Sequence, residues 1–372
     1  MTVFIDNQMT QLIELLSPYA SIMPFDGRTA TTESVAALHE QLVAYEAGAI
    51  IVRSTTIVDE KLLHNTLVRF VATATAGADH VDQAYLIEHD ITFASAAGSN
   101  ANAVAEYVML AIAAWQVEIA QLTLGIVGYG NVGRRLAFHA RSVGMNVIVY
   151  DPPLAEVQAL AEVVGVTGRA GDAGVTVLTS DLDVLLSTSD IVSLHVPLTH
   201  SGLHKTSNMI SAEHISRLRS GALFVNTSRG GIVDEEALKK RLKSGEISVA
   251  VDVYTNEPLI DLDLVSLALI STPHIAGYTI QAKRSASRLA GLAFLEWIGA
   301  PTHNFDIALE DLSIEASLPR DLVTETNRMR EEFGRIKSVY PTLTPTPQEL
   351  VAAFDHLRKS YQLTHELLHD PE

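Results

Sequence analysis

The stretch Leu124-Gly-Ile-Val-Gly-Tyr-Gly-Asn-Val-Gly133 places three glycines directly after a short apolar run. Residues 124–127 predict a buried strand, and residues 131 to about 143 predict a helix. A G-x-G-x-x-G pattern alone is weak evidence, because such glycine turns occur by chance in many chains. The strand before it and the helix after it make a dinucleotide-binding turn the stronger interpretation.

Each glycine of this turn has a separate expected task. Gly128 permits the tight turn, Gly130 lets the backbone approach a pyrophosphate closely, and Gly133 permits close packing of helix on strand. The helix then begins at Asn131 and Val132, whose amides are expected to face the phosphates.

A second predicted strand, residues 146–150, ends at Asp151, which stands 23 residues after Gly128. A carboxylate at this spacing accepts both ribose hydroxyls and repels a 2′-phosphate, so the sequence predicts NAD rather than NADP as cofactor. Asp151 has a simpler alternative interpretation as a helix cap or turn former before Pro152 and Pro153.

The composition indicates a globular protein of two or three domains, with 372 residues of which 47% are hydrophobic. Lys plus Arg number 26 and Asp plus Glu number 44, giving a net charge of −18. Such a charge repels nucleic acid and anionic lipid, so neither is expected as a partner. Individual arginines and lysines become informative instead, since an acidic substrate would need them.

The chain contains no cysteine, which excludes disulfides, thiolate catalysis and cysteine metal sites. Its first residues lack the basic region of a secretion signal, and the most apolar segment, residues 107–117, is too short to span a membrane. We therefore expect a cytoplasmic protein, and we assign no metal ligands.

Helical segments alternate along most of the chain with strand-like ones, which is typical of parallel α/β folds. Besides the two strands above, the expected strands are residues 3–6, 49–52, 70–73, 92–94, 191–195, 223–226, 249–253 and 270–271. Long helices expected at residues 102–119 and 280–297 suggest that the chain leaves one unit and returns to it. The predicted organisation is an N-terminal unit of residues 1–101 with 282–300, an inserted nucleotide-binding unit of residues 102–281, and a small appended unit of residues 301–372. Residues 155–179 are expected to form a surface insertion with a partial helix, and the tail to end in a helix at 347–368.

Three segments, residues 226–234, 252–258 and 272–279, each follow a predicted strand, where ligands bind in open α/β sheets. Arg229 can hold a carboxylate and polarise a neighbouring oxygen, and His274 has the pKa range to take and return a hydroxyl proton. Glu257 can orient His274. Singly, these are an ordinary surface arginine, a turn glutamate and a core histidine, but together they indicate hydride transfer on a hydroxy acid.

Through the glycine turn, Ser228-Arg229-Gly230, residues 252–257 and Pro273-His274, the chain resembles the D-2-hydroxy-acid dehydrogenase superfamily. Within it, the chain is most similar to the erythronate-4-phosphate dehydrogenases. The segments that narrow the resemblance are Val52-Arg-Ser54, Phe70 to Gly77, Asp79-His-Val-Asp82, Asp151-Pro-Pro153 and His274-Ile-Ala-Gly-Tyr278.

This resemblance implies a doubly wound NAD-binding sheet inserted in a flavodoxin-like substrate domain, with the tail as an α+β dimerisation domain of a homodimer. It implies NAD-linked oxidation of 4-phosphoerythronate to the 2-oxo acid, a step of vitamin B6 biosynthesis. Arg229, Glu257 and His274 would be catalytic, with His274 as proton donor. The implied substrate contacts are Ser54, Thr75 and Tyr278, and the implied NAD contacts are Asp151, Thr227, Ser228, Arg229, Asp252 and Gly277.

The basic residues that would bind the substrate phosphate are not specified by this pattern. Arg53, Arg28 and Lys283 are candidates, and each is otherwise a solvated surface charge. Two other functions stay open: a dehydrogenase of another hydroxy acid, such as 3-phosphoglycerate, and a non-catalytic protein that senses NAD.

Overall fold

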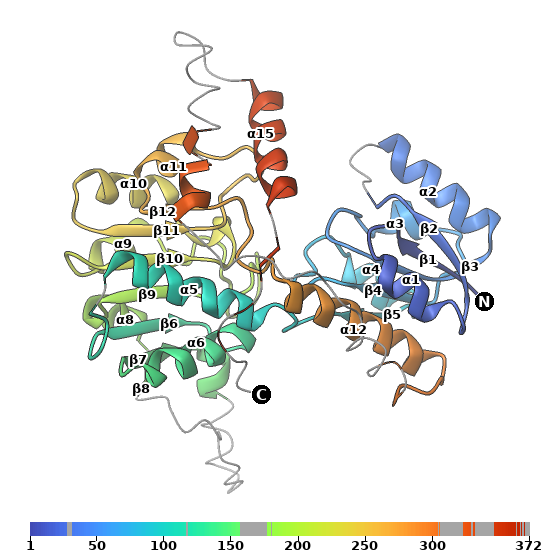
Figure 1. The fold of residues 1–372 in the computed structure, drawn as a ribbon, viewed down its shortest axis with the longest axis horizontal. Helices are drawn as coiled ribbons and strands as arrows, with labels where there is room; N and C mark the ends of the chain where they lie inside the picture. Colours follow the sequence, from blue (N-terminus) through green and yellow to red (C-terminus); the bar gives the residue numbers. More distant parts are fainter. Residues whose placement is uncertain are drawn as a thin grey trace, which may run out of the picture. The chain divides into compact units, whose positions relative to one another are not determined.

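The computed structural model describes residues 1–27, 32–116, 118–156, 177–179, 181–303, 305, 323–328, 330–331, 346–361, 363–364, 366 and 368. Its contacts divide the chain into two compact units (Figure 1). Unit 1 comprises Met1–Asn100 with Thr279–Ala316, and unit 2 comprises Ala101–Tyr278 with Ser317–Glu372. The separate domain expected at residues 301–372 stays a prediction, and its described part from residue 323 onward packs with unit 2.

Unit 1 is built on five parallel strands in the order β2-β1-β3-β4-β5, which is the flavodoxin-like order. The chain starts at β1, adds β2 on one side, and crosses over to β3 on the other. The unpredicted strand is β2, whose Pro24 is tolerated because β2 lies at the edge of the sheet. The strands are β1 Thr2–Asp6, β2 Ser21–Phe25, β3 Ala47–Val52, β4 Phe70–Thr73 and β5 Thr92–Ser95.

Helices of unit 1 begin at polar capping residues. Asp59 and Asp82 accept backbone N–H bonds in the first turns of α3 and α4, and Thr279 does so for α12. The buried face of α12 packs with residues of β1, β3 and β4 in one apolar cluster, which explains why this late segment belongs to unit 1. The helices are α1 Thr10–Leu16, α2 Thr32–Ala44, α3 Glu60–Leu63, α4 Gln83–Glu88 and α12 Ile280–Trp297.

Unit 2 is built on seven parallel strands in the order β12-β11-β10-β9-β6-β7-β8. The chain enters at β6, runs outward to β8, and then returns to β9 on the other side of β6. The order therefore reverses between β6 and β9, and ligands of such sheets bind at this reversal. The strands are β6 Thr123–Val127, β7 Asn146–Tyr150, β8 Val177–Thr179, β9 Ile191–Leu194, β10 Leu223–Asn226, β11 Ser248–Val251 and β12 Ile270–Ser271.

Helices cover both faces of this second sheet, so the predicted doubly wound α/β class is confirmed (Figure 1). One apolar cluster joins the sheet to α5 and α6, and another joins it to α8 through α11. The helices are α5 Ala101–Trp115, α6 Asn131–Ser142, α8 Leu182–Thr188, α9 Ala212–Arg217, α10 Glu235–Lys243 and α11 Leu262–Leu267, with a 3₁₀ turn, η1, at Gly230–Ile232.

The expectation for residues 155–179 was wrong at its end. Val177–Thr179 forms β8, which pairs in parallel with β7 and extends the sheet. Three residues without a clear apolar alternation carry too little signal for a strand, and the β7 edge supplies the pairing. Residues 157–176 of the expected insertion lie outside the described residues.

The described tail contains a helix at residues 323–328 and α15 at Pro347–Ser360, eight residues shorter than expected. Thr346 and Glu349 form a reciprocal cap at the start of α15. The tail also protects a sheet edge, because Thr326 Oγ1 accepts the backbone N–H of Ser271 in edge strand β12 at 3.1 Å.

Candidate active site

The glycine turn after β6 has the geometry that its sequence predicts. Gly128 has φ +95°, and a Cβ there would lie 2.6 Å from the backbone oxygen of His195. A Cβ on Gly133 would lie 2.2 Å from the oxygen of Gly128, so helix and strand pack without room for a side chain. At Gly130 a Cβ would meet no atom within 4 Å among the described residues. The loop is therefore packed on the protein side and open at Gly130.

Helix α6 begins directly after this opening. Its N-cap is Gly130, which has no side chain to accept the amides of the first turn. Those amides, at Asn131, Val132 and Gly133, remain donors at the positive end of a twelve-residue helix. A pyrophosphate is the type of ligand that this arrangement fits.

Asp151 follows β7 and fixes the glycine turn. Its Oδ2 accepts the backbone N–H of Tyr129 at 2.7 Å, and its Oδ1 accepts that of Leu154 at 3.0 Å. The carboxylate thus serves as a cap, as in the simpler interpretation. Two oxygens with about four acceptor sites still leave capacity for ribose hydroxyls.

The segment after β10 is held by Asn226, whose side chain accepts the Ser228 N–H at 3.1 Å and donates to the Arg229 carbonyl at 3.1 Å. Ser228 is buried and donates to the Leu194 carbonyl at the end of β9. Thr227 is half-buried, and its Oγ1 is buried without a hydrogen-bond partner among the described residues. Arg229 Nη1 donates to the Ser228 carbonyl at 2.7 Å. Asn226 was not predicted as a site residue, although it ends its strand.

Gly230 joins this segment to the one after β11. A Cβ on Gly230 would lie 1.9 Å from the carbonyl carbon of Tyr254, which is backbone and cannot move aside easily. Next to this contact, Glu257 Oε1 accepts the Tyr254 N–H at 2.7 Å. The glycine of Ser-Arg-Gly therefore brings the Arg229 segment against the loop that carries Glu257.

His274 and Glu257 form the predicted pair, with Nδ1 of His274 2.7 Å from Oε2 of Glu257. The two side chains are 30% and 21% exposed, so the imidazole is sheltered yet accessible. His274 has φ +58°, a strained conformation for a residue with a Cβ. Such strain is found where the surroundings enforce it and is common at functional sites.

Hydrogen bonds to Asp252 fix the backbone conformation of the His274 segment. Its carbonyl accepts the His274 N–H at 2.8 Å, and its carboxylate accepts the N–H groups of Ile275 and Ala276 at 2.8 Å each. Thr272 adds a third bond to the carboxylate at 2.6 Å. Asp252 is 1% exposed, and burial raises the pKa of its carboxyl despite the opposing charge of His274 and these hydrogen bonds. Asp252 therefore acts within the protein as the anchor of this segment, and its predicted contact with NAD stays a prediction.

His195 lies at the end of β9, beside the glycine turn. Its N–H donates to the Val127 carbonyl at 2.7 Å, and Nε2 lies 2.8 Å from Oγ of Ser193. Burial lowers the pKa of His195 to about 3, so the ring is neutral at neutral pH. His195 was not predicted as a site residue, although a histidine at a strand end near the reversal point was a usable signal.

In unit 1, the predicted substrate residues Ser54 and Thr75 follow β3 and β4. Ser54 is exposed in a turn, and Thr75 is half-buried. Thr75 donates to the Gly77 carbonyl at 2.8 Å, so its Oγ1 accepts from Thr73 at 2.7 Å. Because the Thr73 hydroxyl already donates its only proton to Thr75, it accepts a hydrogen bond from Nε2 of His80 at 2.9 Å. This chain of bonds fixes the direction of each hydroxyl.

Two of the three phosphate candidates also lie in unit 1. Arg53 donates to buried Asp6 at 3.2 Å, an ion pair at the point where the strand order reverses between β1 and β3. Desolvation by neighbouring groups, together with the charge of Arg53, lowers the pKa of Lys283 on α12. The cost of placing two cations near each other would be relieved by a bound anion. Arg28 lies outside the described residues.

Comparison with known proteins identifies the family. Residues 106–276 match the family described as D-isomer specific 2-hydroxyacid dehydrogenase, NAD binding domain. The erythronate-4-phosphate dehydrogenase of Klebsiella pneumoniae (strain 342) is 34% identical, over 97% of this chain and 91% of that protein. That of Photorhabdus laumondii is 35% identical, over 97% and 92%. This chain belongs to the erythronate-4-phosphate dehydrogenase family.

As a member of the erythronate-4-phosphate dehydrogenase family, the chain is an NAD-dependent 2-hydroxy-acid dehydrogenase. Its fold is also that of more distant solved structures. The NAD⁺-bound 3-phosphoglycerate dehydrogenase of Entamoeba histolytica aligns with a TM-score of 0.64 and 23% identity, covering 82% of this chain and 97% of that one.

Within this dehydrogenase, the turn after His274 carries the two remaining predicted residues. Gly277 and Tyr278 are both half-buried, and the Tyr278 N–H donates to the Ile275 carbonyl at 2.8 Å. The Tyr278 ring faces Arg358 of α15, whose Cζ lies 5.2 Å from the ring centroid. Arg358 was not predicted from sequence, since nothing in its local pattern distinguishes it from the neighbouring solvated Lys359.

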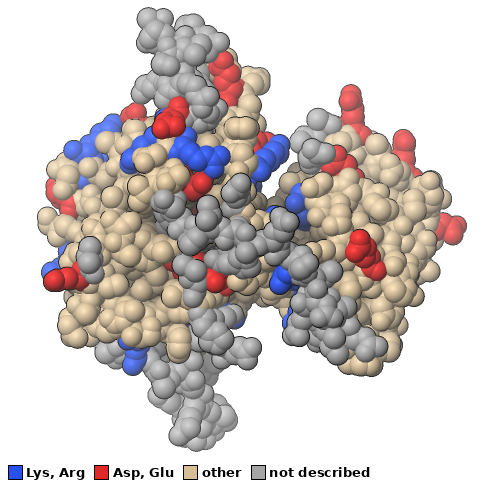
Figure 2. Space-filling view, viewed as in Figure 1, with Lys and Arg blue, Asp and Glu red and all other residues tan. Residues whose placement is uncertain are grey.

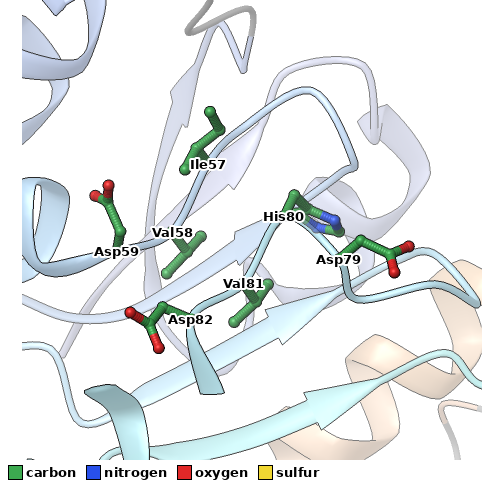
Figure 3. Close-up of a pocket in the computed structure, with 7 residues that line it drawn as sticks. All are labelled: Ile57, Val58, Asp59, Asp79, His80, Val81 and Asp82. Carbon is green, nitrogen blue, oxygen red and sulfur yellow. The ribbon is translucent and has the colours of Figure 1, made fainter. Parts of the chain in front are cut away.

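A pocket of about 490 Å³ in unit 1 is not a suitable site for an acidic substrate. Figure 3 shows its lining, which includes Asp59, Asp79, Asp82 and His80. Two of the carboxylates already cap α3 and α4. Three carboxylates would repel a phosphorylated acid, so we place no dehydrogenase substrate there.

Charges of both signs are scattered over the described part of the face seen in Figure 2, and uncharged residues form most of it. With a net charge of −18, attraction of an anionic substrate must therefore come from local cations. Among the described helices, none combines the length and apolarity needed to cross a bilayer.

Proposed function

We propose that this enzyme oxidises 4-phospho-D-erythronate to 3-hydroxy-2-oxo-4-phosphobutanoate with NAD, in the biosynthesis of pyridoxal 5′-phosphate. The observation that carries the proposal is the His274–Glu257 pair at 2.7 Å, in a chain of the erythronate-4-phosphate dehydrogenase family. Conversion of a 2-hydroxy acid to a 2-oxo acid removes one proton from oxygen and one hydride from carbon. The protein must hold a base at that oxygen.

The residues present fit NAD. An open position at Gly130, uncapped amides at the start of α6 and the carboxylate of Asp151 match pyrophosphate and ribose. We infer that these groups hold the cofactor together with the segment Thr227 to Arg229, Asp252 and Gly277. When bound, NAD supplies the acceptor for the hydride.

His274 is the base in this proposal. Its Nδ1–H donates to Glu257, which leaves the lone pair of Nε2 available for the hydroxyl proton of the substrate. The carboxylate of Glu257 then stabilises the resulting imidazolium and holds the ring in place. In the reverse direction, the same Nε2–H returns the proton.

Arg229 binds the substrate carboxylate and polarises the C2 oxygen in this proposal. The hydroxyl groups of Ser54, Thr75 and Tyr278 contribute hydrogen bonds to the remainder of the substrate without adding charge. Arg53 and Lys283 bind the phosphate, which carries between one and two negative charges near neutral pH.

The test is NADH formation by the purified enzyme with 4-phosphoerythronate, 3-phosphoglycerate or lactate, with a 2-oxo acid present to relieve product inhibition. We expect a strong preference for 4-phosphoerythronate, and Arg229→Ala should lose most of it. Preference for 3-phosphoglycerate would retain the mechanism but replace the substrate. Binding of NAD without turnover on any of the acids would instead support an NAD-sensing protein.

We also infer that the enzyme is a cytoplasmic homodimer, with residues 301–372 forming the dimerisation domain. The family resemblance supports the dimer, and the absence of cysteine fits the reducing cytoplasm. Light scattering after gel filtration measures the mass in solution. A mass of one chain over a wide concentration range would rule out the dimer.

A further inference from the structure

Helix α15 contacts both segments that carry the catalytic pair. The ring of Phe354 packs edge-on against Tyr254, with centroids 6.2 Å apart and planes at 88°. Tyr254 lies between Asp252 and Glu257. One helical turn further along α15, Arg358 lies over the ring of Tyr278, in the segment that follows His274. These contacts join residues 100 and 80 positions apart in the sequence, so a helix of the tail packs against the candidate site.

This contact lies in a packed region of the described part of the tail. Phe354 is 1% exposed and belongs to the same apolar cluster as Tyr254. Arg328 Nη2 donates to Ser360 Oγ at 2.9 Å, which ties the helix at 323–328 to the end of α15. Thr326 in turn accepts the Ser271 N–H of β12. The position of α15 on unit 2 is therefore fixed from several sides.

The guanidinium of Arg358 has an environment unlike that of a surface arginine. Its Nε is buried and has no hydrogen-bond partner in the described part of the chain. Such burial is unfavourable unless another interaction offsets it, and attraction to the negative face of the Tyr278 ring does so. The adjacent Lys359 shows the contrast, since it is 69% exposed and lies 3.7 Å from Asp355.

We propose that Arg358 is a positioning residue of the substrate site, which holds the ring of Tyr278 by a cation–π contact and thereby sets the direction of its hydroxyl. This inference rests on the proposed function, in which Tyr278 binds the substrate. It makes the tail helix part of substrate recognition, in addition to any role in assembly. Loss of Arg358 changes binding of 4-phosphoerythronate more than it changes the chemistry at His274.

The first experiment compares Arg358→Met, which keeps the apolar stem, with Arg358→Lys and the matched control Lys359→Met. We expect Arg358→Met to raise KM for 4-phosphoerythronate about threefold to thirtyfold, the range of a partly desolvated cation–π contact. Arg358→Lys should restore part of this loss, and kcat should change less than KM. Lys359→Met should match the wild type, because its side chain is solvated.

Two further measurements, Tm and the Kd for NAD, separate positioning from general damage. Tm and the Kd for NAD should stay at wild-type values in Arg358→Met, and a fall in both with KM unchanged for the folded fraction would overturn the inference. If Arg358→Met does not fold, Arg358→Gln, which also removes the charge, carries the comparison, and an unaltered KM in that variant would likewise overturn the inference. A wild-type enzyme that does not oxidise 4-phosphoerythronate would refute the proposed function itself, which is a distinct result.

A double-mutant cycle identifies the residue through which Arg358 acts. In a Tyr278→Leu background, Arg358→Met should change KM less than twofold, because the ring that the guanidinium holds is already absent. Multiplication of the two single effects would show that Arg358 acts independently of Tyr278. That result would reject a positioning role.

Discussion

The hydroxyl oxygens of Tyr107 and Thr272 lie 2.5 Å apart, although 165 residues separate them in the sequence. Thr272 donates to Oδ1 of Asp252 at 2.6 Å, so the shared proton with Tyr107 comes from the tyrosine. Asp252 in turn holds the backbone of the His274 segment. A residue in the middle of α5 is thereby connected to the strained conformation of the candidate base.

Tyr107→Phe removes the first bond of this chain and keeps the buried ring. We expect a loss of about 1 kcal/mol in unfolding free energy, the usual value of one buried hydrogen bond. We expect kcat to fall about threefold to tenfold, because Thr272 becomes free to turn away from Asp252 and the His274 segment gains freedom. Urea unfolding and steady-state kinetics measure the two effects. Tyr45→Phe, at an exposed position of unit 1, is the control.

An unchanged kcat in Tyr107→Phe, with the stability loss present, would mean that Thr272 and Asp252 hold their geometry without Tyr107. The hydrogen bond between Tyr107 and Thr272 would then stabilise the fold without affecting His274.

Two glycines of unit 2 should respond oppositely to alanine. Gly130 has an open Cβ position and φ −79°, so Gly130→Ala should keep Tm or raise it slightly. Its methyl group would project into the space that we assign to the pyrophosphate, so the Kd for NAD should rise at least about tenfold. Gly230→Ala should instead cost about 3 kcal/mol of stability or more, because its Cβ would overlap the Tyr254 backbone.

Calorimetry gives both quantities for each variant. Weakened NAD binding in Gly130→Ala accompanied by a fall in Tm would indicate a folding defect. The assignment of the pyrophosphate site to this turn would then lose its support.

Sequence alone predicted most of the sheet framework. The strands at 70–73, 146–150, 223–226 and 270–271 have the predicted bounds, because buried parallel strands are apolar runs with sharp ends. The strands β2 and β8 were missed. Both lie at sheet edges, where Pro24 is permitted in one and the other has only three residues, so neighbouring strands rather than local pattern determine them.

The candidate site could be predicted where it depends on local sequence. Arg229, Glu257 and His274 each follow a strand, and parallel strands bring such positions to one edge. The supporting residues depend on contacts over long sequence distances, and no local pattern reveals them. Tyr107 is one residue of an apolar helix, and Arg358 is one of several charges on α15; only packing distinguishes them from their neighbours.

His195 should make stability depend on pH in a defined window. Its pKa is about 3 in the folded protein, below the ordinary value of 6.5, because burial disfavours the charged ring. The contribution of neutral His195 to the free energy of unfolding is fully present above pH 6.5. It is lost as the pH falls towards 3, because the unfolded chain binds a proton at this histidine at a higher pH than the folded protein does. Allowing for partial contact with solvent, we expect about 2 kcal/mol to be lost by about pH 4.5.

Unfolding free energy measured between pH 7 and about pH 4.5 should therefore decline less steeply in His195→Gln than in the wild type. His200→Gln, at an exposed position, should follow the wild-type curve. Parallel curves for His195→Gln and the wild type would mean that the folded protein binds a proton at His195 as easily as the unfolded chain does.

Lys283 tests the assignment of the phosphate to unit 1. The Lys283 residue is exposed, but desolvation by neighbouring groups and the nearby charge of Arg53 lower the pKa of its amine, and a bound phosphate would stabilise the charged form. Lys283→Met keeps the apolar stem and removes the charge, so KM for 4-phosphoerythronate should rise about tenfold or more, as for a charge-assisted hydrogen bond. The Kd for NAD should not change, because the cofactor residues that we assign lie in unit 2.

The control is Lys61→Met, which removes an exposed charge of unit 1 and should leave both KM and the Kd for NAD unaltered. Equal KM values in Lys283→Met and Lys61→Met would exclude Lys283 from the phosphate site and leave Arg53 as the described candidate in unit 1.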